Sequence, residues 1–119
     1  MILQNANILI VEDEPLVALD LAFGVEDEGG TVIGPAATLV EALSLVTKEI
    51  QGAILDFHLP DGDVSEVLHA LLARGLPVVV QTGGGLPAGL TEEYPNLVVL
   101  MKPNDPARLV AELWDQMRP

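Results

Sequence analysis

The chain has 119 residues, of which half are hydrophobic, four are aromatic and none is cysteine, and its formal net charge is −13. This length predicts a single domain over residues 1–119. The scarcity of Lys and Arg excludes binding to nucleic acid or to an anionic membrane surface, and the absence of Cys excludes disulfides and zinc-thiolate sites. The N-terminus lacks a basic region, and no apolar run approaches the ~20 residues that span a bilayer, so we expect a cytoplasmic protein.

Helical and strand patterns alternate through the first half of the chain, where short apolar runs are typical of buried strands. We predict strands over 7–11, over 31–34, where Pro35 ends the strand, and over 53–56, and helices over 15–28 and 39–50. Leu16, Leu19 and Phe23 form the expected apolar stripe on the core side of the first helix. Thr38 and Glu41 match a capping box at the start of the second helix.

The same alternation continues through the second half of the chain. We predict strands over 76–81 and 97–101 and helices over 64–74 and from Pro106 to about Met117. Residues 83–96 hold four Gly and two Pro and predict an irregular stretch in which a short helix fits near 90–94. Five strands alternating with four or five helices predict an α/β fold with helices on both faces of a parallel sheet. We expect the flavodoxin-like strand order 2-1-3-4-5.

Polar residues suited to one site follow four of these apolar runs. Glu12 and Asp13 come after the first strand, Asp56 ends the third, and Thr82 and Lys102 follow the fourth and fifth. The carboxyl ends of parallel strands share one edge of the sheet, which is where ligands bind in open α/β folds. The sequence therefore predicts that three carboxylates, a hydroxyl and an ammonium group meet at this edge.

The chemistry of these groups points to a metal ion and a phosphoryl group. Oxygen ligands without His or Cys side chains favour Mg²⁺ or Mn²⁺, and Mg²⁺ commonly completes its coordination with water and phosphate oxygens. A carboxylate such as Asp56 can also act as the nucleophile in phosphoryl transfer. Lys102 and Thr82 would then offset and bind the charge on the transferred group.

The motifs VEDE at 11–14, LDFHLPDGD at 55–63, the strand-end Thr82 and MKP at 101–103 occur in this order along the whole chain. With them the chain resembles the receiver (CheY-like) domain of two-component response regulators. The resemblance implies that Asp56 is the phosphoacceptor and that a sensor histidine kinase or a histidine phosphotransfer domain donates the phosphate.

The resemblance also assigns roles to the other site residues. It implies that Glu12, Asp13, Asp56 and the backbone carbonyl of His58 hold Mg²⁺, with Glu12 acting through water. It implies that Thr82 and Lys102 bind the phosphoryl oxygens and that the Lys102–Pro103 bond is cis. A domain of this kind assists only its own phosphorylation and dephosphorylation, so we do not expect an enzyme.

The chain departs from the family pattern in its signalling half. Val99 occupies the position, three residues before Lys102, where receivers usually carry Tyr or Phe, and Val64 replaces a common glycine. The run PVVVQTGG at 77–84 is similar to a receiver subgroup with a Thr-Gly motif after the fourth strand and an atypical fourth helix. This similarity favours a signal read out by ordering of the glycine-rich loop.

Two other functions stay open beside a phosphorylated receiver. A pseudo-receiver that only binds proteins is favoured by the missing aromatic residue, and a flavodoxin-like cofactor binder ranks last because its phosphate would meet acidic side chains. The sequence identifies neither the downstream partner nor the oligomeric state, and a homodimer remains open. The output is a protein contact, a phosphate sink or a domain outside this chain.

Overall fold

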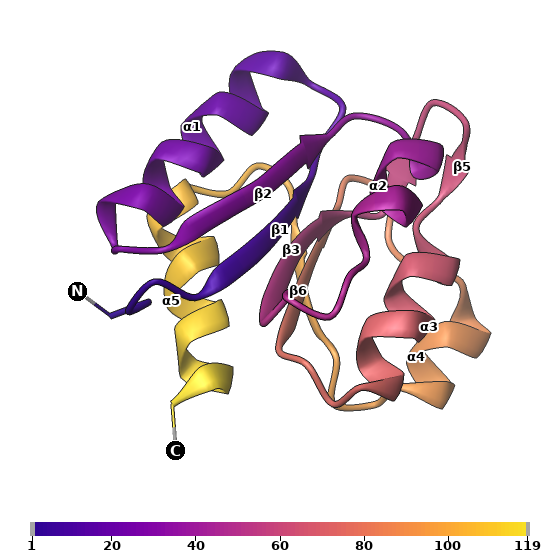
Figure 1. Ribbon diagram of the computed structural model, residues 1–119. Coiled ribbons are helices and arrows are strands. Elements are labelled where there is room, and N and C mark those ends of the chain that lie inside the picture. The colour runs from indigo at the N-terminus through magenta and orange to yellow at the C-terminus, as the bar shows by residue number, and fades with distance from the viewer. Residues whose placement is uncertain (1, 119) are drawn as a thin grey trace.

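Five parallel strands form one sheet in the order β2-β1-β3-β6-β7 (Figure 1), which confirms the predicted order 2-1-3-4-5 for the strands of the sheet. The short strands β4 and β5 pair separately as an antiparallel hairpin. The computed structural model describes residues 2–118. Its elements are β1 (Asn7–Val11), α1 (Pro15–Asp27), β2 (Thr31–Ala36), α2 (Leu39–Leu45), β3 (Gly52–Asp56), β4 (His58–Leu59), β5 (Gly62–Asp63), α3 (Ser65–Ala73), β6 (Val78–Thr82), α4 (Ala88–Glu93), β7 (Val98–Met101) and α5 (Pro106–Met117).

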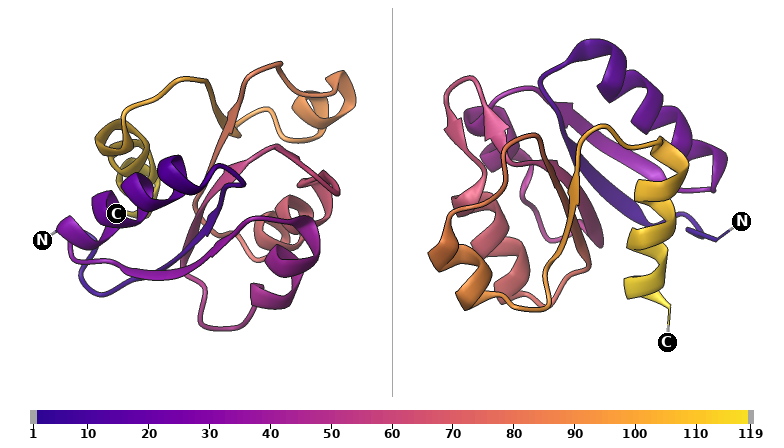
Figure 2. Two further views of the ribbon diagram at one scale, coloured as in Figure 1. Left: turned by 90° about the horizontal axis from the view of Figure 1, so that it is seen from above. Right: turned by 180° about the vertical axis from the view of Figure 1, so that it is seen from behind.

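Helices cover both faces of the sheet (Figure 2). Successive residues of a strand pack into opposite layers. In β1, Ile8 and Ile10 pack in the core under α1 and α5, whereas Leu9 and Val11 pack in the core under α2, α3 and α4. This alternation follows from the two-residue period of a strand. All residues of β3 and β6 are buried, as expected for central strands of a parallel sheet. Among residues 2–118, no helix combines the length and apolarity needed to cross a bilayer.

The prediction that the second strand ends before Pro35 is wrong, because the strand continues to Ala36. The register runs from Leu9↔Ile33 to Val11↔Ala36, so β2 holds one extra residue at this point. Gly34 has a φ of 99°, a conformation that favours glycine, as in a β-bulge. A proline is tolerated here because β2 is an edge strand and the bulge interrupts the ladder.

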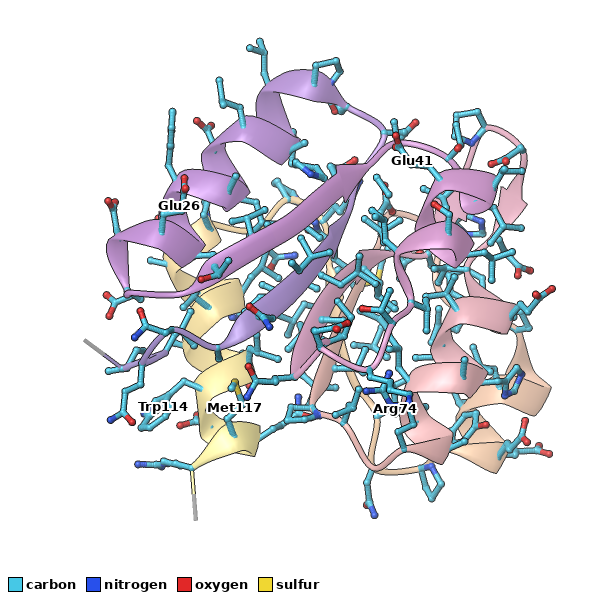
Figure 3. All side chains as sticks on the ribbon, viewed as in Figure 1. Glu26, Glu41, Arg74, Trp114 and Met117 are labelled. Atoms are coloured by element: carbon cyan, nitrogen blue, oxygen red, sulfur yellow. The ribbon has the colours of Figure 1, made fainter. Side chains whose placement is uncertain are left out.

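The second helix is shorter than the predicted range 39–50 and ends at Leu45. The predicted N-cap is present, because Thr38 Oγ1 accepts a hydrogen bond from the Glu41 amide. The Glu41 side chain completes the cap one residue earlier than in a capping box, because its Oε1 accepts from the Ala37 amide instead of the Thr38 amide. Beyond the helix, the Arg74 guanidinium donates to the carbonyls of Thr47, Lys48 and Ile50 (Figure 3). These hydrogen bonds satisfy backbone carbonyls of the segment that follows the helix.

The predicted core stripe of α1 is wrong, because Leu16, Leu19 and Phe23 are exposed by 74%, 48% and 54%. The buried residues of α1 are Ala18, Leu21 and Val25, which have the same helical spacing. The acidic residues distinguish the two sets. Asp20 lies four residues after Leu16 and Asp27 four residues after Phe23, so these acidic residues share the face of the exposed apolar set. The helix therefore presents an apolar and acidic face to solvent.

The β4–β5 hairpin is fastened to α2 by Asp61, which lies in its turn. The two carboxylate oxygens of Asp61 accept hydrogen bonds from the backbone amides of Leu39 and Val40, at 2.7 and 3.1 Å. These amides belong to the first turn of α2, where no intrahelical acceptor exists. These hydrogen bonds lower the pKa of Asp61. The hairpin that follows Asp56 therefore serves as a cap for a helix earlier in the chain.

The two faces of α1 predict opposite responses to truncation. Leu21→Ala removes a side chain that is 1% exposed and should lower the free energy of unfolding by about 2–5 kcal/mol. Leu19→Ala, a matched change on the exposed face, should change it by less than about 0.5 kcal/mol. Urea unfolding of both variants measures this difference, and equal losses would contradict the orientation of α1.

Candidate functional site

Three carboxylates meet at the carboxyl edge of the sheet, as the sequence predicted. Glu12 and Asp13 follow β1, Asp56 ends β3, and one oxygen from each lies within 4.8 Å of the others. Glu12 and Asp56 are 2% and 4% exposed, whereas Asp13 is exposed. Neighbouring carboxylates repel each other and are poorly solvated when buried, so this cluster requires compensating positive charge.

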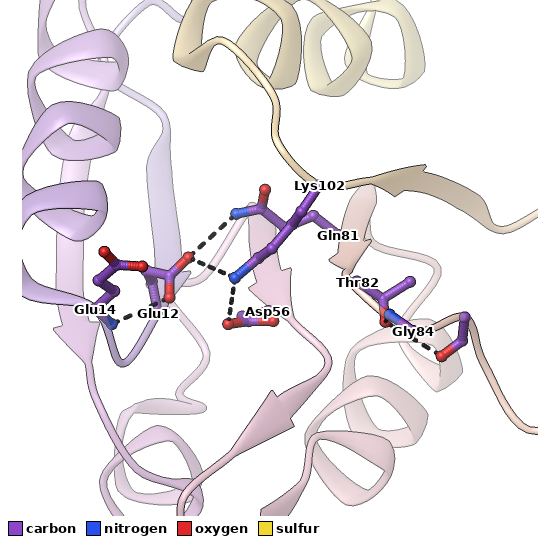
Figure 4. A network of polar contacts seen from close by, with 8 residues as sticks. Glu12, Glu14, Asp56, Gln81, Thr82, Gly84 and Lys102 are labelled. Atoms are coloured by element: carbon purple, nitrogen blue, oxygen red, sulfur yellow. Dashed lines mark hydrogen bonds and ion pairs between the residues drawn. The ribbon is translucent and has the colours of Figure 1, made fainter.

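Lys102, which directly follows β7, supplies positive charge to this cluster (Figure 4). Its Nζ donates to Asp56 Oδ2 at 2.8 Å and to Glu12 Oε1 at 3.3 Å. Its backbone amide donates to the Thr82 carbonyl at 2.9 Å, which continues the β6–β7 ladder by one residue. The Lys102–Pro103 bond is cis, as the family resemblance implied.

The pKa values of Glu12 and Lys102 are both raised, for different reasons. Burial is the main cause that raises the pKa of Glu12 from 4.5 to about 7, and the charge of Asp56 adds to it. Burial also tends to lower the pKa of Lys102, but the hydrogen bond to Asp56 and the charge of Glu12 outweigh it, so the pKa of Lys102 is raised. The lysine is therefore positively charged at neutral pH, and Glu12 exchanges its proton near pH 7 in the absence of another cation.

Thr82 lies at the predicted strand end, but its hydroxyl is engaged elsewhere. Its Oγ1 accepts a hydrogen bond from the Gly84 amide at 3.3 Å and donates one to the Gly85 carbonyl at 3.2 Å. The structure thus brings Glu12, Asp13, Asp56 and Lys102 together and leaves the Thr82 hydroxyl on the glycine-rich loop. His58 begins β4 two residues after Asp56, with an exposed side chain. The role of its carbonyl stays a prediction.

Gln81 is a site residue that the sequence analysis missed. Its side-chain amide donates to Glu12 Oε1 at 3.4 Å, and the residue is 2% exposed. Prediction from strand ends singled out Thr82 and passed over the residue before it. The available signal was a glutamine closing the buried run Val78–Val80, because an amide buried among apolar residues requires a polar partner.

The carboxylate oxygens present at this edge fit a divalent cation such as Mg²⁺. Carboxylate oxygens are hard ligands, and the three carboxylates come from adjacent strands with oxygens close enough to share one ion. One ammonium group against three carboxylates leaves the cluster short of positive charge. Exposed Asp13 keeps one side of the cluster accessible to ions and phosphate from solvent.

Comparisons with known proteins relate the chain to response regulators, although no protein-family model matches it. The phyllosphere-induced regulator PhyR of Methylorubrum extorquens is 40% identical over 110 residues, which cover 89% of this chain and 38% of PhyR. The regulator BvgA of Bordetella pertussis is 31% identical over 85 residues, which cover 71% of this chain and 41% of BvgA. The chain thus spans less than half of each of these relatives.

A solved structure is similar to this chain over nearly its whole length. The CheY-like response regulator receiver domain protein of Methanospirillum hungatei superposes with a TM-score of 0.80 and 28% identity. The superposition covers 93% of this chain and 92% of that protein.

The raised pKa of Glu12 predicts a pH dependence of stability in metal-free buffer. Between pH 4.5 and about 7 the folded protein binds the Glu12 proton more tightly than the unfolded chain does, so this contribution to stability is lost as pH rises. The difference in free energy of unfolding between wild type and Glu12→Gln should therefore shift against the wild type across this range. Urea titrations in EDTA from pH 4.5 to 8 measure it, and a constant difference would contradict the shift.

Proposed function

Because this chain is a receiver domain of the response-regulator family, which takes part in two-component signalling, we propose that it accepts a phosphoryl group on Asp56. The observation that carries this proposal is the 2.8 Å ion pair between Lys102 Nζ and Asp56 Oδ2, next to two further carboxylates. Lys102 would place its charge where negative charge builds up during phosphoryl transfer.

The proposed reaction moves a phosphoryl group from histidine to aspartate. An oxygen of Asp56 attacks the phosphorus of a phosphohistidine, a P–O bond forms, and the P–N bond breaks with its electron pair leaving on the imidazole. Mg²⁺, or Mn²⁺, would neutralise charge on the phosphoryl oxygens when bound. Glu12, Asp13, Asp56 and the His58 carbonyl would hold the ion. The domain would assist only its own phosphorylation and dephosphorylation.

A second candidate function is that of a pseudo-receiver, which binds partners without phosphorylation. The observation that favours it is Val99, a half-buried aliphatic residue of β7 where receivers usually carry an aromatic residue. The occupied hydroxyl of Thr82 fits either function.

Labelling with a small phosphodonor distinguishes these two functions. Acetyl phosphate with Mg²⁺ should add one phosphoryl group to Asp56, with release of acetate, and intact-protein mass spectrometry should detect it. Asp56→Asn should remain unlabelled. EDTA or Asp13→Asn should reduce labelling at least tenfold, because both would remove the ion that offsets phosphoryl charge. A wild-type protein that stays unlabelled at saturating donor and Mg²⁺ would favour the pseudo-receiver.

Phosphorylation would reach the surface through Thr82 and the glycine-rich loop. A phosphoryl group on Asp56 would offer strong acceptor oxygens to the Thr82 hydroxyl, which now donates to the Gly85 carbonyl. The hydroxyl cannot donate to both acceptors, so the loop would have to rearrange. A Cβ atom built on Gly83 or Gly84 would meet no atom within 4 Å, so open space surrounds this part of the loop.

This mechanism predicts a change confined to residues 83–96. Beryllofluoride with Mg²⁺, a mimic of the phosphorylated state, should slow amide exchange across residues 83–96 as the loop becomes ordered. Thr82→Ala should abolish the response in the loop. Hydrogen-exchange mass spectrometry measures both, with α5 as an internal reference, and unchanged exchange in the wild-type loop would contradict the mechanism.

The exposed face of α1 suits the docking of a protein phosphodonor. Leu16 lies in the first turn of α1, four residues after Glu12, so a partner lying along this helix would reach the site edge. Phe23 lines a groove of about 440 Å³ between α1 and α5, together with Asp20 and Asp105. Apolar residues beside acidic ones favour a partner helix with apolar and basic residues.

Substitutions on this face should separate protein donors from small donors. Phe23→Asp should slow phosphoryl transfer from purified, autophosphorylated histidine kinases at least tenfold, because it would place a charge in an apolar contact, yet leave acetyl phosphate labelling unchanged. Val40→Asp is the matched control, since Val40 of α2 is 72% exposed and faces away from this groove. Unaltered transfer to Phe23→Asp from every kinase that phosphorylates wild type would contradict the docking face.

A further inference from the structure

Gln81 occupies the same row of the sheet as two of the acidic residues. Its register partner on β3 is Asp56, and the preceding row pairs Val80 with Leu55 and Leu55 with Val11. Glu12 follows Val11 directly, so Glu12, Asp56 and Gln81 stand side by side across three strands. Register partners project to the same face of a sheet, which brings the Gln81 amide to the carboxylates.

The Glu12 carboxylate is held at both of its oxygens (Figure 4). Oε2 accepts a hydrogen bond from the Glu14 backbone amide at 3.1 Å. Oε1 accepts from two side chains, Gln81 Nε2 at 3.4 Å and Lys102 Nζ at 3.3 Å. One oxygen therefore has two donors, and they differ in a decisive way, because the amide is neutral whereas the ammonium group is charged.

Gln81 and Lys102 are not equally able to stay hydrogen-bonded to Glu12. Lys102 lies closer to Asp56, at 2.8 Å, and the proposed function would draw it further toward the phosphoryl group. The positive charge of Lys102 next to Glu12 would also repel a bound cation. The neutral amide of Gln81 orients the carboxylate without repelling the ion. Gln81 is thus the donor that can stay on Glu12 while the site is loaded.

We propose that Gln81 is a positioning residue that holds Glu12 in its metal-facing orientation and retains it there when Lys102 turns to the phosphoryl group. The inference rests on the proposed function for the metal and for the movement of Lys102. It assigns a role to a residue outside the carboxylate, threonine and lysine set. Outer partners of metal ligands act in this way because they fix the geometry of the ligand.

Magnesium affinity in a double-mutant cycle tests the role. Gln81→Met keeps the length of the side chain but removes the donor, and isothermal titration calorimetry gives the Mg²⁺ dissociation constant. In the wild-type background, where Lys102 still holds Oε1, the constant should rise only a few-fold. In the Lys102→Met background it should rise at least tenfold, the lower end of the range typical of outer-partner loss. Gln81→Asn should behave as Gln81→Met, because the shorter amide cannot reach Glu12.

The outcomes separate this role from a structural one and from failure of the proposed function. Equal fold-changes in both backgrounds, or none, would overturn the role, because a residue that only packs does not depend on Lys102. Wild type that binds no Mg²⁺ would overturn the metal assignment and this inference together. If the variants fail to fold, the side-chain amide signals of Gln81 in wild-type NMR spectra decide. They should shift on adding Mg²⁺ with beryllofluoride, and unshifted signals would overturn the role.

Discussion

Glu12 and Asp56 lie side by side in a buried strand row, and the ammonium group of Lys102 offsets their mutual repulsion. With Asp13 included, three carboxylates face one ammonium group, so full ionisation leaves two negative charges. The folded protein relieves part of this excess through the raised pKa of Glu12. A divalent cation would balance the same excess without protonation, which connects the electrostatics of the site to its proposed use.

Backbone pairing in the sheet brings these groups to one edge. Parallel register aligns the ends of β1, β3 and β6, and the ladder between β6 and β7 extends to the Lys102 amide. All residues of β3 and β6 are buried, so the strands that carry Asp56 and Thr82 form the most protected part of the fold. In contrast, the loop that follows Thr82 is rich in glycine. The buried strand β6 and the glycine-rich loop therefore meet at Thr82.

The sequence was sufficient where a single pattern had a single structural solution. Short apolar runs placed the five strands, and their ends located Glu12, Asp13, Asp56 and Lys102. It was insufficient where two solutions shared one period, as in α1, whose two apolar sets have equal spacing. It also failed after α2, where the Arg74 guanidinium binds the carbonyls of Thr47 and Lys48 in a segment that was predicted to be helical. The orientation of the Thr82 hydroxyl depends on loop geometry, which strand patterns do not contain.

The carboxylate of Asp61 joins two segments that the chain order separates. An isolated helix of seven residues, the length of α2, is unstable in water, because helix nucleation costs more than so few hydrogen bonds return. Here two amides of the first turn are satisfied by a residue about twenty positions later. Local unfolding of the β4–β5 hairpin would remove this cap, so α2 and the hairpin should open and close as one cooperative unit. The segment next to Asp56 would thus share its local stability with a helix that lies about twenty residues earlier in the chain.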